Sequence, residues 1–198
     1  DLPISKSTKG LIFEDLCKSL DIPVVVGNSV SYSACLSLMR TGVAGVLIGV
    51  GPGAACTSRS VLGIGVPQIT ATIDSAAARD TYYEESGRYV PVITDGGFHR
   101  GGEICKAVAA GADGVMLGSI FAQAEDSPGR GYHWGMANPH PALPRGTRIK
   151  VGTTGTLEQI LYGPTSVTDG SQNLVGALKT AMGLCGAANI GEMHQAEM

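Results

Sequence analysis

The sequence has few of the features that mark membrane, secreted or nucleic-acid-binding proteins. It contains no signal peptide and no apolar run long enough to span a bilayer. Lys and Arg do not cluster, and the net charge of −3 argues against a nucleic-acid surface. The five cysteines show no Cys-x-x-Cys spacing, so neither a zinc site nor a disulfide framework is expected. This cysteine usage favours a reducing cytoplasm.

Aromatic residues are also scarce, at 5% of the chain, whereas glycine occurs 29 times. This composition predicts many tight loops around a core built from the 43% of residues that are hydrophobic. A length of 198 residues corresponds to one domain or part of one. Because the chain starts at Asp1 without a methionine, we expect an upstream segment that this sequence does not include.

Apolar runs typical of buried strands alternate with segments of helical periodicity, which indicates a parallel sheet covered by helices. Strands are predicted at 22–27, 45–50, 90–94 and 114–117, and helices at 10–20, 31–40, 66–85, 102–110, 157–162 and 171–184. Residues from about 126 to 150 are rich in proline, glycine and histidine without periodicity, so we expect a mobile, flap-like excursion there.

An internal repeat supports this alternation. Residues 40–49 and 109–118 share three glycines and one valine in register, as expected for two copies of a helix end, a turn and a buried strand. A complete (β/α)8 barrel has eight such units. With four predicted strands, residues 1–198 are expected to form the C-terminal half of an α/β TIM barrel.

The most informative stretch is residues 45–59, where an apolar run breaks into a glycine-rich loop that leads to Cys56. A cysteine on a loop at the carboxyl end of a strand is where the nucleophile of an α/β enzyme lies. The alternative is an inert cysteine, which is common in protein cores. The loop does not have the Gly-x-Gly-x-x-Gly spacing, so a Rossmann nucleotide site is not favoured.

Two later strands end in loops suited to a nucleotide. Gly96, Gly97 and Gly118 would expose backbone N–H groups to a phosphate, and Ser119 would open a helix whose N-terminus favours an anion. Asp95 could accept hydrogen bonds from two ribose hydroxyls. Each loop alone is also consistent with a tight turn or a helix cap. Together with the loop that carries Cys56, they predict a nucleotide site.

Five motifs in the same order resemble the IMP dehydrogenase/GMP reductase family. They lie at residues 49–59, 65–68, 95–97, 110–119 and 125–129. The similarity runs from about residue 23 to about residue 136 and resumes more weakly in the tail. It looks closest to the IMP dehydrogenase-like branch without CBS domains.

The resemblance implies NAD-dependent oxidation of IMP to XMP through a thioimidate on Cys56, with potassium ordering the cysteine loop. It further implies a cytoplasmic homo-oligomer, a tetramer in this family, with no nucleic-acid or membrane partner. The implied catalytic residues are Cys56, Ser58 and Arg145, and the implied substrate-binding residues are Ala54, Asp95, Gly96, Gly97, Gly118, Ser119, His133, Met136 and Ala137. Asn28, Gly49 and Gly51 would face the cofactor, and carbonyls of Gly51, Gly53 and Cys56 would hold potassium.

Several positions depart from the family pattern. Ala54 replaces a serine that touches phosphate, and His133 falls where a phosphate-binding tyrosine is expected. Arg148 lies near the position of a Glu or Gln that contacts the base. The excursion lacks the Arg-Tyr pair that helps to activate water, and Arg145 is the nearest candidate for that role, with His140 as the alternative. These departures bear on the hydrolysis step rather than on the fold.

Two other functions remain open at this stage. A GMP reductase would use the same cysteine and phosphate loops with NADPH, although Gly118-Ser119 and the proline in residues 127–129 favour the dehydrogenase. A purine-nucleotide-binding regulatory relative without turnover would explain the missing Arg-Tyr pair. In either case, residues 1–198 alone are expected to be inactive, since half of the barrel is missing.

Overall fold

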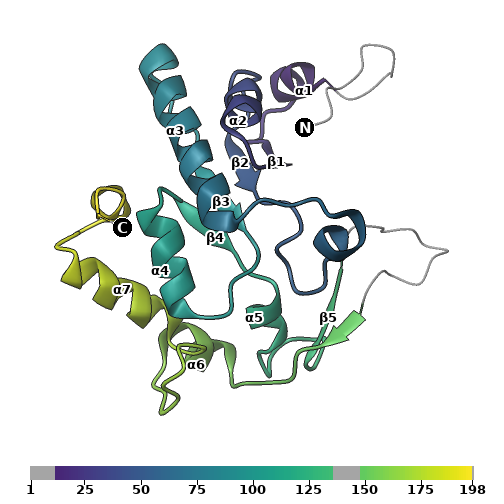
Figure 1. The fold of residues 1–198 in the computed structure, drawn as a ribbon, viewed down its shortest axis with the longest axis vertical. Helices are drawn as coiled ribbons and strands as arrows, with labels where there is room; N and C mark the ends of the chain where they lie inside the picture. The colour runs from purple at the N-terminus through teal and green to yellow at the C-terminus, as the bar shows by residue number, and fades with distance from the viewer. Residues whose placement is uncertain (1–11, 136–147, 198) are drawn as a thin grey trace.

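The computed structural model describes residues 12–135 and 148–197, and its centre is a sheet of four parallel strands (Figure 1). The strands lie side by side in chain order: β1 (Val25–Ser29), β2 (Gly45–Ile48), β3 (Val92–Asp95) and β4 (Gly114–Met116). A helix follows each strand: α2 (Tyr32–Met39), α3 (Gln68–Ser86), α4 (Gly101–Ala109) and α5 (Ser119–Ala122). Sequential parallel strands joined by helices are the arrangement of a (β/α)8 barrel. The predicted α/β architecture is therefore confirmed, with four βα units that correspond to half of such a barrel.

The remaining elements flank these units. Helix α1 (Phe13–Ser19) precedes the sheet, and a π-helical turn, η1 (Ser58–Leu62), lies between β2 and α3. The tail contributes α6 (Leu157–Tyr162), α7 (Leu174–Leu184) and α8 (Ile190–Met193). Among the described residues, no helix has the length and apolar character needed to span a membrane.

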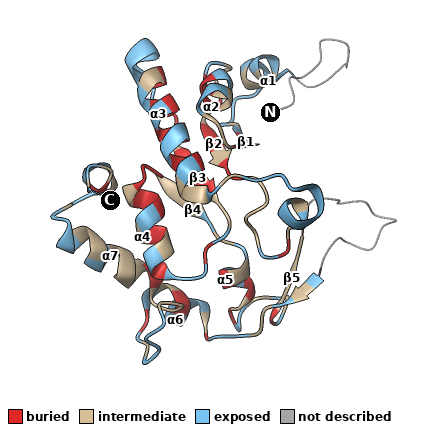
Figure 2. Ribbon diagram, in the orientation of Figure 1, coloured by how far each residue is buried: buried red, intermediate tan, exposed pale blue. Residues whose placement is uncertain are grey.

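The main core lies between the sheet and helices α2 and α3. Val46 and Ile48 of β2 are fully buried against it, whereas Leu47, which points to the other face, is only partly buried. Figure 2 shows the buried residues concentrated where the helices meet the sheet. Within the described residues, β1 and β4 each pair on one side only. A second core joins α4, α6 and α7, where a Cβ at Gly101 would lie 2.5 Å from Cβ of Ala177.

The internal repeat corresponds to two equivalent turns. Gly42 and Gly111 have φ angles of +92° and +102°, a left-handed conformation that glycine adopts without strain. Strands β2 and β4 begin three residues later, at Gly45 and Gly114. The shared glycines are thus explained by the turn between each helix and its following strand.

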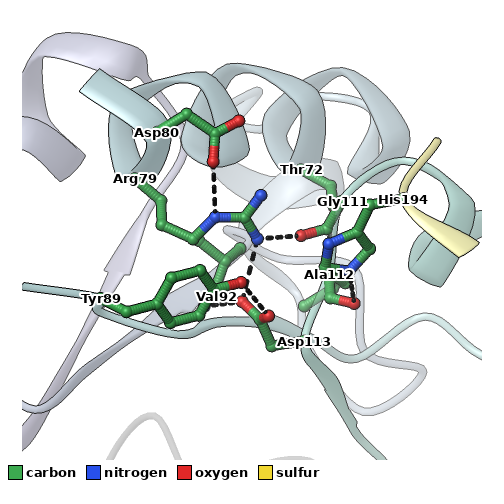
Figure 3. Close-up of polar contacts among 10 residues, drawn as sticks. Thr72, Arg79, Asp80, Tyr89, Val92, Gly111, Ala112, Asp113 and His194 are labelled. Carbon is green, nitrogen blue, oxygen red and sulfur yellow. Dashed lines mark hydrogen bonds and ion pairs between the residues drawn. The ribbon is translucent and has the colours of Figure 1, made fainter. Parts of the chain in front are cut away.

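A buried polar network fixes the amino ends of β3 and β4 (Figure 3). The Arg79 guanidinium, from α3, donates to the carbonyl of Gly111 at 2.7 Å and to Asp113 Oδ2 at 3.0 Å. Asp113 also accepts a 2.8 Å hydrogen bond from the backbone N–H of Val92 and one from the Tyr89 hydroxyl. Burial, followed by the bond to Asp113, raises the pKa of Tyr89. The network ties α3 to two strands at the edge opposite the predicted site.

The fold differs from the expectation in several places: the first strand lies at Val25–Ser29 rather than 22–27, η1 and α8 were not predicted, and the excursion contains strands. The two ends of the excursion are paired: β5 (Tyr132–Trp134) and β6 (Arg148–Lys150) form an antiparallel ladder. The absence of periodicity concealed them because each strand has only three residues. The part of the excursion between these strands, from 136 to 147, lies outside the described residues.

Candidate active site

The loops that follow β2, β3 and β4 line a cleft of ≈ 610 Å³ at the carboxyl edge of the sheet. Parallel strands bring these loops together, as in barrel enzymes generally. Most of the site residues predicted from sequence lie there: Asn28, Gly49, Gly51, Gly53, Ala54, Cys56, Asp95, Gly96, Gly97, Gly118, Ser119 and His133. Ser58 is not among the lining residues. Met136, Ala137 and Arg145, together with His140, lie outside the described residues.

Cys56 lies on the segment between β2 and α3, residues 49–67, which we call the cysteine loop. Gly49 and Gly51 have φ angles of +127° and +73°, so the loop leaves the strand through conformations that favour glycine. A turn then brings the Cys56 N–H to within 2.9 Å of the Gly53 carbonyl. This turn presents the thiol, which is partly buried, to the cleft.

Ser58 contacts the Cys56 thiol but does not line the cleft. The Cys56 thiol donates to Ser58 Oγ at 3.3 Å. This side-chain hydrogen bond is the largest cause that lowers the pKa of Cys56; the Ser58 backbone and the positive charge of Arg59 add to it, while burial opposes it. By contrast, burial raises the pKa of Cys105. Because the thiolate is the nucleophile, Cys56 is the better prepared of the two for covalent chemistry.

Asp95 is the last residue of β3 and is held by a residue of β1, on the far side of β2 in the sheet. Asn28 Nδ2 donates to Asp95 Oδ2 at 2.8 Å. A carboxylate offers about four acceptor positions, so this contact leaves capacity for the hydroxyls of a bound sugar. Sequence analysis gave these two residues separate roles, whereas the structure brings them into direct contact.

The residues predicted for the phosphate converge from three loops, and we call Gly96, Gly97, Gly118, Ser119 and His133 the phosphate end. A Cβ at Gly118 would lie 3.1 Å from Cε1 of His133, so the imidazole of β5 covers that glycine directly. A Cβ at Gly97 would lie 3.0 Å from Pro52, which places this loop against the cysteine loop. Gly97 also has a φ of +85°, so its backbone and its contact with Pro52 both favour glycine, whereas a methyl group at Gly118 would require the His133 ring to shift.

Sequence analysis gave no role to Gln68, the first residue of α3. Its Nε2 donates to the carbonyls of Ile48, Asp95 and Gly96 at 3.3, 3.0 and 3.4 Å. A Cβ at Gly49 would lie only 2.5 Å from that nitrogen, so glycine is required there. Gln68 therefore joins the tips of β2 and β3 beneath the cleft. The one signal for it was its place in the motif at residues 65–68.

Several further lining residues were missed, and one expected residue lies elsewhere. His99 and Trp134 both line the cleft. His99 lies two residues after the Asp95-Gly96-Gly97 motif, a position that could have suggested a role, whereas nothing in the sequence singled out Trp134. Arg148, expected near the base, is not a lining residue. Its guanidinium carbon lies 3.9 Å from the ring centroid of Tyr132 and 5.3 Å from that of Trp134.

The described residues contain no group of three or more His, Cys, Asp or Glu side chains that could hold a metal. A potassium ion would instead depend on backbone carbonyls of the cysteine loop. The Gly53 carbonyl accepts the Cys56 N–H and keeps its second lone pair. A Cβ at Gly53 would meet nothing within 4 Å, so the loop is open around that residue. An oxygen-only donor set of this kind suits a hard cation.

Comparison with known proteins identifies relatives over nearly the whole chain. The model of the IMP dehydrogenase/GMP reductase domain matches residues 9–138. An uncharacterized oxidoreductase of Mycolicibacterium smegmatis is 42% identical over 196 residues, which cover 97% of this chain and 52% of the relative. The inosine-5'-monophosphate dehydrogenase of Methanocaldococcus jannaschii is 35% identical, with 92% of this chain and 40% of the relative covered.

A solved structure shows the same fold. The crystal structure of an IMP dehydrogenase/GMP reductase-like protein from Corynebacterium glutamicum matches with a TM-score of 0.85 and 39% sequence identity. The match covers 93% of this chain and 49% of that protein. The chain thus spans about half the length of the relatives that it matches.

Proposed function

Because the chain belongs to the IMP dehydrogenase/GMP reductase family, we propose that the full-length protein oxidises IMP to XMP with NAD⁺. The observation that carries this proposal is the position of Cys56. Its thiol, with a lowered pKa, lies in one cleft with the Asp95 carboxylate and the phosphate end. Membership of an oxidoreductase family fits a nucleophile placed beside a nucleotide site.

The three parts of a nucleotide would meet three different loops. The phosphate would bind at the phosphate end, where the glycines and His133 line the cleft. The Gly96 N–H already donates to the Met116 carbonyl at 3.1 Å, so the proposed N–H donors are those of Gly97, Gly118 and Ser119. The ribose would donate its hydroxyls to Asp95, which Asn28 holds in place. The purine would then lie over the cysteine loop, with its C2 atom beside Cys56. Met136 and Ala137 are proposed to contact the base.

The chemistry of this chain centres on the thiol. The Cys56 thiolate adds to C2 of the purine, and a hydride leaves that carbon, which produces a thioimidate between Cys56 and the nucleotide. A water molecule then adds to C2, the carbon–sulfur bond breaks, and XMP is released with Cys56 restored. A base must take the proton from this water, and Arg145 is proposed for that role. NAD⁺, when bound, supplies the acceptor for the hydride, and Asn28 and Gly49 are proposed to face its nicotinamide.

Potassium is part of the proposal as a structural aid to this loop. The carbonyls of Gly51, Gly53 and Cys56 would hold the ion, and the loop between them has no bulky side chain to keep its shape. We further propose a cytoplasmic homo-oligomer. The five cysteines are free, which fits a reducing compartment.

The experiment is to incubate the full-length protein with IMP and NAD⁺ and to follow XMP and NADH together. Cys56→Ala should retain IMP binding and abolish NADH formation, whereas Cys105→Ala, a matched control away from the cleft, should leave turnover intact. Conversion of GMP to IMP and ammonia with NADPH would instead identify a reductase. IMP binding without turnover in either direction would identify a regulatory nucleotide-binding protein.

A further inference from the structure

The two ends of the cysteine loop are joined by one side chain. Arg59, in the η1 turn, donates from Nε to the carbonyl of Val50 at 3.1 Å. Its Nη2 donates to the carbonyl of Val66 at 2.6 Å. Val50 follows β2 and Val66 precedes α3, so a single guanidinium bridges the exit and the return of the loop that carries Cys56.

Two glycines form the slot through which this side chain passes. A Cβ at Gly51 would lie 2.9 Å from Cγ of Arg59, and a Cβ at Gly65 would lie 2.7 Å from its Nε and 2.8 Å from its Cγ. All three distances are shorter than the contacts that Cβ atoms make in real proteins. The arginine stem therefore occupies space that any other residue at either position would take. A planar, forked donor suits this task because it reaches two carbonyls from one rigid group.

We propose that Arg59 is a positioning residue that holds Cys56 in its reactive place by closing the cysteine loop. The proposal rests on the proposed role of Cys56 as the nucleophile. Without Arg59, the exit and the return of the loop would lose this bridge, and the thiol would sample more positions relative to C2 of a bound nucleotide. A misplacement of about 1 Å can lower the rate by about 100-fold.

This role predicts a specific kinetic change. Arg59→Ala should lower kcat by about 10-fold or more and leave the KM for IMP almost unchanged, because the phosphate end and Asp95 belong to other loops. Arg88→Ala is the matched control. The Nη2 of Arg88 donates to the carbonyls of Gly42 and Val43 at 2.9 Å each, so Arg88 also contacts two carbonyls, but from a single nitrogen and at the opposite edge of the sheet. It should leave both constants at the level of the wild type.

A double-mutant cycle with Gly65→Ala separates this role from general stability. Gly65 does not have a left-handed φ, so alanine is strained there only by its collision with Arg59. Gly65→Ala alone should slow turnover, and in the Arg59→Ala background it should have no further effect. Arg59→Lys keeps the charge but not the fork, and should recover only part of the rate. Because Arg59 is exposed, the midpoint of thermal unfolding of Arg59→Ala should fall no further below the wild-type value than that of Arg88→Ala.

The rate at which iodoacetamide alkylates Cys56, taken at the high-pH plateau where the thiol is fully ionised, provides a readout that needs no nucleotide. At that plateau the rate does not depend on the pKa of Cys56, which the charge of Arg59 also lowers. Arg59→Ala and Gly65→Ala should each lower the alkylation rate, and Gly65→Ala should have no further effect on it in the Arg59→Ala background. If the alkylation cycle holds but the protein does not oxidise IMP, the proposed function fails and the positioning role stands. Additive effects of Arg59→Ala and Gly65→Ala, or an Arg59→Ala protein that behaves like Arg88→Ala, would overturn the inference.

Discussion

Replacement of Asp113 by asparagine is expected to destabilise the protein without changing its chemistry. The Asp113 side chain is 18% exposed and pairs with Arg79, whose side chain is 5% exposed. Asparagine keeps the size of aspartate but removes the negative charge that pairs with Arg79, and it replaces one acceptor oxygen with an NH2 group. If that group takes the place of Oδ1, Tyr89 loses its acceptor; if it takes the place of Oδ2, Arg79 and Val92 both lose theirs (Figure 3). Among the described residues, the acidic partner left to Arg79 would be Asp80, whose side chain is 64% exposed.

Removal of one partner from a buried ion pair costs about 3–5 kcal/mol, and the partial exposure of Asp113 favours the lower end. Asp80→Asn breaks the other, exposed pair with the same arginine and should cost about 1 kcal/mol or less. Urea denaturation of the full-length protein measures both. The kcat of folded Asp113→Asn should equal that of the wild type, because the network lies at the amino ends of the strands. Equal losses of stability in the two variants would refute this reasoning.

Three further predictions concern the site. Because the pKa of Cys56 is lowered and that of Cys105 is raised, alkylation of Cys56 should reach half of its plateau rate at a lower pH than alkylation of Cys105. Peptide mapping that finds the lower half-plateau pH for Cys105 would contradict this. Gly118→Ala should weaken IMP binding several-fold, since its Cβ would lie 3.1 Å from the His133 ring, while alkylation of Cys56 stays unchanged; tight IMP binding in titration calorimetry would exclude a phosphate there. Replacing K⁺ by Li⁺ at constant ionic strength should depress turnover more than IMP binding, and equal rates in both salts would argue against a cation in the cysteine loop.

The sequence predicted the fold well because the relevant signals are local. Apolar β-branched runs give the strands, and the glycines at positions 42 and 111 mark equivalent turns because a left-handed φ favours glycine. The carboxyl ends of neighbouring parallel strands must meet at one edge of the sheet. The sequence alone therefore predicts that the loops of Cys56, Asp95 and Gly118 lie close together, as they do in the cleft.

What the sequence did not predict depends on contacts between distant segments. Gln68 donates to carbonyls of two different strands, and nothing in the sequence around Gln68 indicates those acceptors. The fork of Arg59 likewise depends on how residues 50 and 66 approach each other. Strands β5 and β6 have three residues each and are separated in sequence by residues 135–147, so no periodicity or turn motif indicated their pairing.

The most direct test of the account is the mass of Cys56 during turnover. Full-length protein is mixed with IMP and NAD⁺, quenched in acid within the first turnover, and digested. The peptide that contains Cys56 should carry a covalent purine nucleotide in an amount that matches the NADH formed, and Cys56→Ala should show neither. NADH formation without any adduct on Cys56, or an adduct on another cysteine, would contradict the assignment of Cys56 as the nucleophile.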